Sequence, residues 1–239
     1  MTFLESKTEL CSLLDIDYTD IANNQLISDA ELGYWINSAA IRAWDFRAWD
    51  FSEGEDATNL TSATEKFTYP DTFVAGSVWL LMIAGLGEYD KKDYQSFRKF
   101  KINYPTATDK IYSEYKNYIY LNTAAHAVGL AITLLGKLKF TKLVNTTDKL
   151  PFSPVSDDLE YSGNRAIVKL AYAEALASRK YSETDRAATE EAAAFNILKI
   201  LWEPFAEARA NSQSKDRPFF DVPDYFGPGS PNIGQFGND

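Results

Sequence analysis

The sequence has little of the chemistry on which many enzymes and secreted proteins depend. Its 239 residues include one cysteine and one histidine. Cys11 has no second cysteine for a disulfide, which fits a protein made in a reducing compartment, and its apolar neighbours favour a small buried residue over a nucleophile. His126 alone excludes a multi-histidine metal site, and a Ser-His-Asp triad would depend on it. Alanines and a valine surround it, so we interpret it as structural.

Long apolar runs and an excess of positive charge are also missing. The longest mostly apolar run, residues 76–86, is too short to span a membrane. No secretory signal is visible in the first residues, so we expect neither secretion nor membrane contact. The formal net charge is −10, the opposite of what a protein that grips nucleic-acid phosphates needs. An acidic surface does suit a protein that encircles DNA and lets it slide.

Motifs for nucleotide binding and acid/base catalysis are incomplete. Gly85-Leu-Gly87 lacks the third glycine of a dinucleotide fingerprint, and no Walker lysine pattern occurs. The acidic pairs Asp157-Asp158 and Glu190-Glu191 lie near expected helix starts, where carboxylates cap the helix or face solvent. A short basic patch at residues 91–101 is interpreted as solvated surface. We therefore expect no catalytic residue, no metal and no cofactor, and hence no enzyme.

Helical patterns occupy both ends of the chain. A short helix is expected at residues 3–13. Ser28-Asp-Ala-Glu31 is a capping box, and the apolar residues after it follow helical spacing: Leu32, Trp35, Ile36, Ala39, Ala43 and Phe46. Beyond the proline-rich breaker at 150–154, alanine-rich helices are expected at 164–181 and from residue 182 onward. Pro204 should kink or break the last of them.

The middle of the chain has the alternation of short strands. We expect a polar loop at residues 52–63 and then strands at 67–69, 78–83, 118–121 and 128–134, with Phe140 and Leu143 as a possible last strand. Gly, Asn, Asp and Pro separate these segments. The pattern predicts a small antiparallel sheet or barrel, although it does not show which strands pair.

The nearly duplicated stretch Ala43-Trp-Asp-Phe-Arg-Ala-Trp-Asp-Phe51 marks the passage between these regions. Trp44 and Trp49 are five residues apart, which on a continuing helix would place them about 140° apart. We predict that Trp44 stays on the helix, whereas Trp49 and Phe51 leave it. The three residues would then pack the junction to the β region or a neighbouring subunit.

Together these patterns predict an α+β fold with an extended arm. Residues 1–51 and 151–213 would form a helical bundle, residues 52–150 an inserted β-rich region, and residues 214–239 the arm. Glycine and proline oppose regular structure in the arm, yet it is too aromatic for an inert linker. We predict that its aromatic residues bind a partner: Phe219, Phe220, Tyr225, Phe226 and Phe236.

This layout resembles the head-to-tail adaptor (connector) proteins of tailed bacteriophages, especially the podovirus type. The resemblance rests on the helix ending in Ala39–Trp44 and Trp49–Phe51, the strand entering Phe67-Thr-Tyr-Pro70, and the alanine-rich helices at 166–177 and 187–205. It spans most of residues 3–210. The family supplies no catalytic residue to look for.

The resemblance implies a structural protein of the virion, assembled in the host cytoplasm as a ring of typically twelve subunits beneath the portal. Its partners would be the portal protein, neighbouring copies in the ring and downstream tail or nozzle proteins. DNA would pass through the channel with non-specific contact at most. A terminal arm of this kind would grip the portal or a neighbouring subunit.

Two alternatives remain open. The first is another ring of the tail, a terminator or stopper, although the helical core favours an adaptor. The second is a glycan-binding module or hydrolase in the β region. There the side chains of Tyr112, Tyr115, Tyr118 and Tyr120 would stack on sugar rings, and Glu114 or Asp109 would supply a carboxylate.

Overall fold

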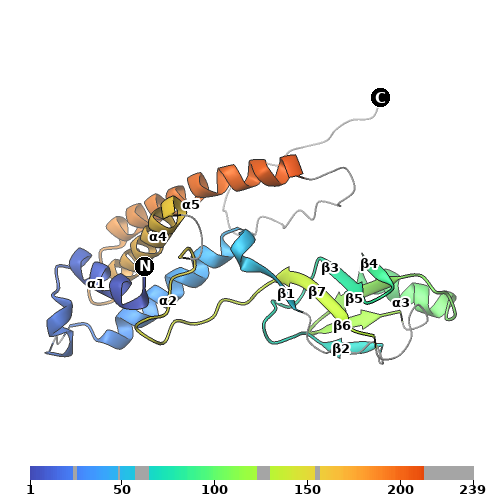
Figure 1. Cartoon of the computed structure of the whole chain (residues 1–239). Coiled ribbons are helices and arrows are strands. Elements are labelled where there is room, and N and C mark those ends of the chain that lie inside the picture. Colours follow the sequence, from blue (N-terminus) through green and yellow to red (C-terminus); the bar gives the residue numbers. More distant parts are fainter. Residues whose placement is uncertain (24–25, 48, 57–64, 123–129, 154–156, 213–239) are drawn as a thin grey trace.

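The computed structural model describes the chain except residues 24–25, 48, 57–64, 123–129, 154–156 and 213–239. The described residues form a helical part and a β part that lie end to end (Figure 1). The helical part combines both ends of the chain, and the β part comes from the middle. The predicted α+β class, with a β region inserted between helices, is confirmed.

The helical part contains four α-helices and two short 3₁₀ segments: α1 (Phe3–Leu13), η1 (Tyr18–Asn23), α2 (Asp29–Asp45), η2 (Asp50–Ser52), α4 (Asp157–Ala177) and α5 (Thr184–Ser212). The predicted capping box starts α2: the Ser28 hydroxyl accepts from the Glu31 N–H, and the Glu31 carboxylate accepts from the Ser28 N–H at 2.9 Å. Thr2 and Glu5 form an equivalent box at α1. These local bonds satisfy amides that the helix itself leaves unpaired.

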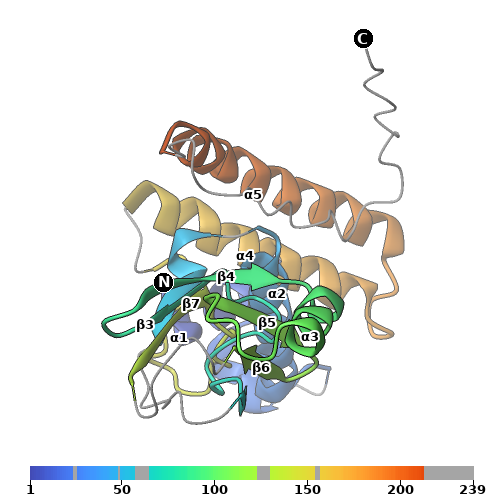
Figure 2. The same ribbon diagram turned by 90° about the vertical axis from the view of Figure 1, so that its right-hand side faces the viewer.

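Helix α4 is central in this part. It lies between α5 on one side and the α1–α2 pair on the other (Figure 2). Its buried residues include four alanines, which leave room for neighbouring helices: Ala166, Ala171, Ala173 and Ala175. The core that results joins α4 to the apolar stripe of α2, where Leu32, Ile36 and Ala39 are fully buried.

The β part is a curled seven-stranded sheet with the order β1-β7-β3-β4-β5-β6-β2. Its strands are β1 (Glu53–Asp56), β2 (Lys66–Thr68), β3 (Leu80–Ile83), β4 (Gly87–Lys92), β5 (Ile111–Tyr115), β6 (Tyr118–Leu121) and β7 (Ile132–Lys137). A second core lies within the β part, with buried residues from most strands, among them Leu81, Tyr89, Tyr112, Ile119 and Leu134.

The sheet differs from the predicted antiparallel one at a single pairing. Strands β4 and β5 run parallel, with Asp90 opposite Ile111, because helix α3 (Tyr94–Asn103) carries the chain back between them. The other five pairings are antiparallel, with β1 on β7, β2 on β6, β3 on β4, β3 on β7, and β5 on β6. The sequence pattern did not indicate α3, and it assigned β1 to a loop.

Three further features differ from the sequence patterns. Phe140 and Leu143 lie outside the strands and pack against the helical core. Of the two expected effects of Pro204, a kink or a break, the break does not occur, because α5 continues to Ser212. Proline removes one backbone donor, and the turns on both sides keep the helix going. Helix α4 begins at Asp157, before the expected residue 164, so the Asp157-Asp158 pair opens the helix.

The chain returns to the helical part before the predicted boundary at residue 150. The Phe3 N–H donates to the Asp148 carbonyl at 2.7 Å, and the Leu150 N–H donates to the Met1 carbonyl at 3.2 Å. Leu143 and Leu150 are buried in the helical core. By its packing, therefore, the inserted β part ends near Leu138. Within the described ranges, no helix has the length and apolar character needed to cross a membrane.

Candidate interaction surface

The helical part carries an open groove between α1, α2 and the returning segment 140–144. Its volume is about 670 Å³. The lining is mainly apolar and includes Phe3, Gly33, Ile41, Phe140 and Leu143. Tyr34, Ile41 and Val144 are exposed large apolar side chains that belong to the same lining. An exposed apolar surface of this kind, edged by polar groups, is typical of a protein–protein contact.

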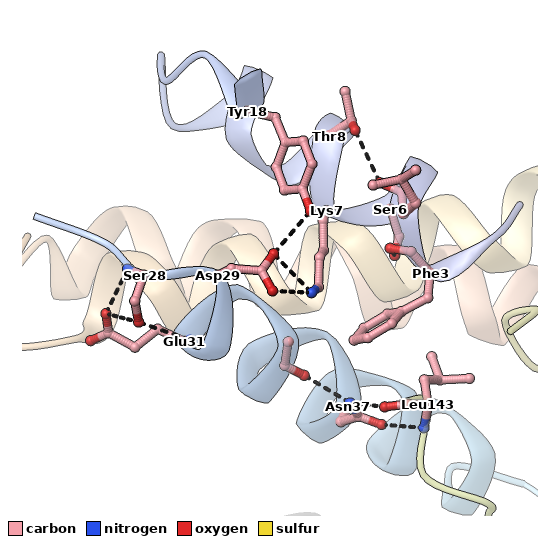
Figure 3. A network of polar contacts seen from close by, with 12 residues as sticks. Phe3, Ser6, Lys7, Thr8, Tyr18, Ser28, Asp29, Glu31, Asn37 and Leu143 are labelled. Atoms are coloured by element: carbon pink, nitrogen blue, oxygen red, sulfur yellow. Dashed lines mark hydrogen bonds and ion pairs between the residues drawn. The ribbon is translucent and has the colours of Figure 1, made fainter. Parts of the chain in front are cut away.

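A charge pair lines part of the groove, with the Lys7 side chain 8% exposed and the Asp29 side chain 51% exposed. Lys7 donates to both carboxylate oxygens of Asp29, at 2.9 and 2.7 Å, and the Tyr18 hydroxyl donates to the same carboxylate at 2.9 Å (Figure 3). Partial burial alone would raise the pKa of Asp29, but the bonds from Lys7 and Tyr18 outweigh it and lower that pKa. The Asp29 carboxylate therefore stays ionised at neutral pH, and its hydrogen bonds tie α1 and η1 to the start of α2.

An asparagine fixes the opposite wall. The Asn37 side chain accepts from the Leu143 N–H at 2.8 Å and donates to the Leu143 carbonyl at 3.1 Å (Figure 3). It also donates to the Gly33 carbonyl at 2.8 Å. Both backbone groups of Leu143 are thus hydrogen-bonded to α2, although the segment around Leu143 has no regular secondary structure. The groove is preformed, so a partner would bind without the cost of ordering it.

The three predicted junction residues meet where the two parts join. Trp49 is fully buried, and its indole N–H donates to the Ala43 carbonyl at 2.8 Å. Its ring stacks on Phe51 at a centroid distance of 5.7 Å. The Trp44 indole N–H donates to the Leu138 carbonyl at 3.0 Å, and its ring contacts Phe51 edge-on. A contact of these residues with a neighbouring copy stays a prediction.

The groups proposed for a glycan site lie on opposite faces of the sheet. Tyr112 is buried in the core of the β part. The Glu114 side chain is 5% exposed and pairs with Lys91 at 2.7 Å. Tyr115 and Tyr118, which oppose each other across β5 and β6, belong to the other face by strand alternation. The structure therefore does not bring Glu114 together with the exposed tyrosines.

Other candidates from the sequence have structural surroundings. Cys11 is buried, and that burial raises the pKa of its thiol. Glu190 pairs with Lys169 at 2.9 Å, and Glu191 pairs with Arg42, so both carboxylates tie α5 to its neighbours. In the part of the chain that the structure describes, no three His, Cys, Asp or Glu side chains gather as metal ligands would.

No family model and no curated protein matches this chain. His126 lies outside the described residues. So do the predicted partner-binding residues of the arm, which are Phe219, Phe220, Tyr225, Phe226 and Phe236.

The sequence patterns did not predict the groove. One signal for it was present, because Tyr34 and Ile41 are large apolar residues off the buried stripe of α2. They are seven residues apart and so share one side of that helix. An apolar pair on the solvent side of an amphipathic helix indicates a second contact surface. The wall supplied by residues 140–144 gave no comparable signal.

Proposed function

We propose that this protein is a structural head-to-tail adaptor of a tailed phage virion. It forms a ring beneath the portal, joins the capsid to the tail and lines the DNA channel, with no enzymatic activity of its own. The observation that carries the proposal is the preformed apolar groove on the helical part, with Tyr34 and Val144 exposed along it. The resemblance in element layout adds the place in the virion.

A closed ring requires each subunit to offer two different and complementary surfaces. The groove supplies one of them. The second is the outer side of α5, which lies across α4 from the α1–α2 pair (Figure 2). Its exposed side chains include four small or apolar ones, Ala188, Ala192, Ala193 and Ile200, among charged and polar ones such as Arg186 and Lys199. Surfaces on opposite sides of one subunit are what head-to-tail packing around a ring needs.

The charge supports the same function. With 34 acidic and 24 basic residues the chain is an unfavourable binder of the DNA backbone. A channel wall that repels phosphates lets DNA pass without being held. The arm, residues 214–239, would reach the portal through its aromatic side chains.

The test is assembly with the portal. The purified protein, mixed with its portal protein, should form closed rings in electron micrographs and give a ring mass in native mass spectrometry. Imaging of virions should then place the ring directly beneath the portal. A position at the distal end of the tail would instead identify a terminator, and wild-type protein that never forms a ring refutes the adaptor.

The groove is tested with a matched pair of variants. Tyr34 in the groove is 65% exposed and Tyr161, on α4 and outside the groove lining, is 64% exposed. Tyr34→Glu should abolish rings, because it places a charge in an apolar contact, and Tyr161→Glu should assemble as the wild type does. Circular dichroism should show both variants folded. Normal rings from Tyr34→Glu would mean that subunits meet elsewhere.

The arm is tested by truncation. A chain that ends at Ser214 should keep its melting temperature and lose attachment to the portal in a pull-down. Unchanged portal binding would show that the arm is not the contact.

A further inference from the structure

The β part carries a second distinctive surface, which we call the tyrosine face. Its residues are Lys66 of β2, Tyr94 of α3, Tyr115 of β5, Lys116 of the turn, and Tyr118 and Tyr120 of β6. Lys66 lies directly opposite Tyr120, and Tyr115 directly opposite Tyr118. Residues opposite each other in antiparallel strands share one face of the sheet.

The rings of this face are ordered by one another. Tyr94 stacks on Tyr115 with centroids 4.2 Å apart and planes at 9°, and its ring lies 5.0 Å from that of Tyr120. The Lys66 ammonium group lies 3.6 Å from the centre of the Tyr118 ring. Lys116 is exposed beside Tyr115, 5.5 Å from the ring centre. The result is a set of fixed rings with cations at their edges.

This surface is not needed to build the core. On β2 and β6 the core-facing residues are Phe67, Ile119 and Leu121, which point to the opposite side of the sheet. Helix α3 covers only part of the outer side, mainly through the buried ring of Phe97. Tyr115 remains 44% exposed. Exposed aromatic surface suits apolar groups, and the lysines beside it suit acidic groups. In a chain of net charge −10 such a local basic edge is uncommon, so we expect a ligand that is both acidic and apolar.

The chain itself contains a segment with that chemistry. Residues 214–239 include four prolines, Pro218, Pro223, Pro228 and Pro231, interleaved with the aromatic residues of the arm. The acidic residues there outnumber the basic ones: Asp216, Asp221, Asp224 and Asp239 against Lys215 and Arg217. Proline-rich segments dock on faces lined by aromatic rings, because they lose little conformational entropy on binding. Because proline has no backbone N–H, a segment with four prolines is poorly suited to pair with the open edge of β2 as an added strand.

The position of α5 determines where the segment starts. The C-terminal end of α5 lies toward the side of the molecule that carries the β part (Figure 1). From Ser212 the chain continues for residues 213–239. Extended, such a length spans up to about 90 Å, against a radius of gyration of about 18 Å for a compact chain of this size. The reach is sufficient for the segment to bind its own β part.

We propose that residues 214–239 dock on the tyrosine face of their own chain when the protein is free in solution. The prolines and phenylalanines pack on Tyr115 and Tyr118, and the aspartates pair with Lys66 and Lys116. In the free protein the segment would thus be held on the β part, and a partner that binds it must displace it. This docking stands independently of the adaptor function, since either can fail alone.

The experiment places a spin label on the segment in the full-length protein. The thiol introduced by Ser230→Cys takes a nitroxide, whereas Cys11 is buried and is not labelled. Amide signals of β5, β6 and α3 should lose at least half their intensity relative to the diamagnetic control, and signals of α4 should not change. Uniform signals in the β part would overturn the proposal.

Two further experiments test whether the broadening depends on the tyrosine face and whether it arises within one chain. The double charge reversal Lys66→Glu with Lys116→Glu should restore the β5 and β6 signals. Lys149→Glu with Arg179→Glu, which changes two exposed basic residues of the helical part outside the groove lining, should leave the broadening in place. Equal effects of the two pairs would refute the tyrosine face as the site. In a second experiment, spin-labelled protein without ¹⁵N is mixed with ¹⁵N-enriched protein that carries no spin label. The amide signals of the ¹⁵N-enriched protein should show no broadening. Broadening in the mixture would mean that the segment binds a neighbouring copy, contrary to the proposal.

Discussion

Trp49→Ala should be among the most damaging single substitutions in the helical part. The Trp49 ring is fully buried where the chain leaves α2, and it packs edge-on against Phe152 at 5.1 Å and Trp202 at 5.4 Å. One side chain therefore connects the end of α2 with α5 and with the segment before α4. Removing it leaves a cavity among rigid rings, which cannot collapse to fill the space.

The magnitude follows from two contributions. Truncation of a buried tryptophan to alanine costs about 3–5 kcal/mol. Losing the bond to the Ala43 carbonyl costs about 1 kcal/mol by itself, a low value for a buried polar group that loses its partner. The cost is low because the Phe46 N–H still approaches that carbonyl at 3.4 Å. Trp49→Phe removes the bond and keeps most of the ring, so it should cost about 1–2 kcal/mol. Against a total stability of about 5–15 kcal/mol, Trp49→Ala is severe.

The assay is urea unfolding at 25 °C, followed by circular dichroism at 222 nm. The free energy of unfolding should fall in the order wild type, Trp49→Phe, Trp49→Ala. The exposed aromatic Tyr161 serves as the control, and Tyr161→Ala should cost less than about 0.5 kcal/mol. A loss below about 1.5 kcal/mol for Trp49→Ala would refute the view that this ring holds the junction.

Three other substitutions test the packing and the helix caps. Gly163→Ala should lower the melting temperature although alanine favours helices, because its Cβ would lie 2.3 Å from the Phe152 ring; a rise in a thermal scan would contradict this. Asn37→Ala should cost about 2–3 kcal/mol in urea unfolding and increase hydrogen exchange at Leu143, since both bonds to that backbone disappear. Hydrogen bonds from a lysine ammonium and from the N-cap backbone lower the pKa of Glu31 from 4.5 to about 2. A depressed pKa contributes stability above pH 4.5 that is lost as the pH falls toward 2, and solvent exposure keeps it below about 1 kcal/mol. Glu31→Gln should therefore flatten the acid limb of the stability curve, and an unchanged limb would refute the assignment.

Elements encoded locally were predicted best. The capping box at Ser28 and the stripe of α2 are set by residues within a few positions of one another, and both occur as expected. Helix α3 was not predicted although Tyr94, Phe97 and Phe100 recur at three-residue spacing, because the helix has only ten residues and its basic residues were interpreted as solvated surface. Strand β1 reads as an acidic loop and owes its form to β7, where Lys137 lies opposite Glu53.

The candidate surface was harder to predict for the same reason. Its α2 side could be noticed from Tyr34 and Ile41, which are close in sequence. Its other wall is held by the bond between Asn37 and Leu143, residues separated by 106 positions. No pattern within one stretch of sequence indicates a pairing of that kind. Contacts between distant segments, which decide the groove, require the fold itself.

The pairing of β1 with β7 also determines how separable the two parts are. Glu53 and Lys137 are direct partners in neighbouring strands, so the inserted part begins and ends at adjacent points, with Cα atoms about 5 Å apart. Among the described residues, the helical core takes none from between Phe51 and Phe140. The β part is thus an exchangeable module. A short turn in its place would close the same gap, and its size and surface are free to diverge while the helical scaffold keeps its shape.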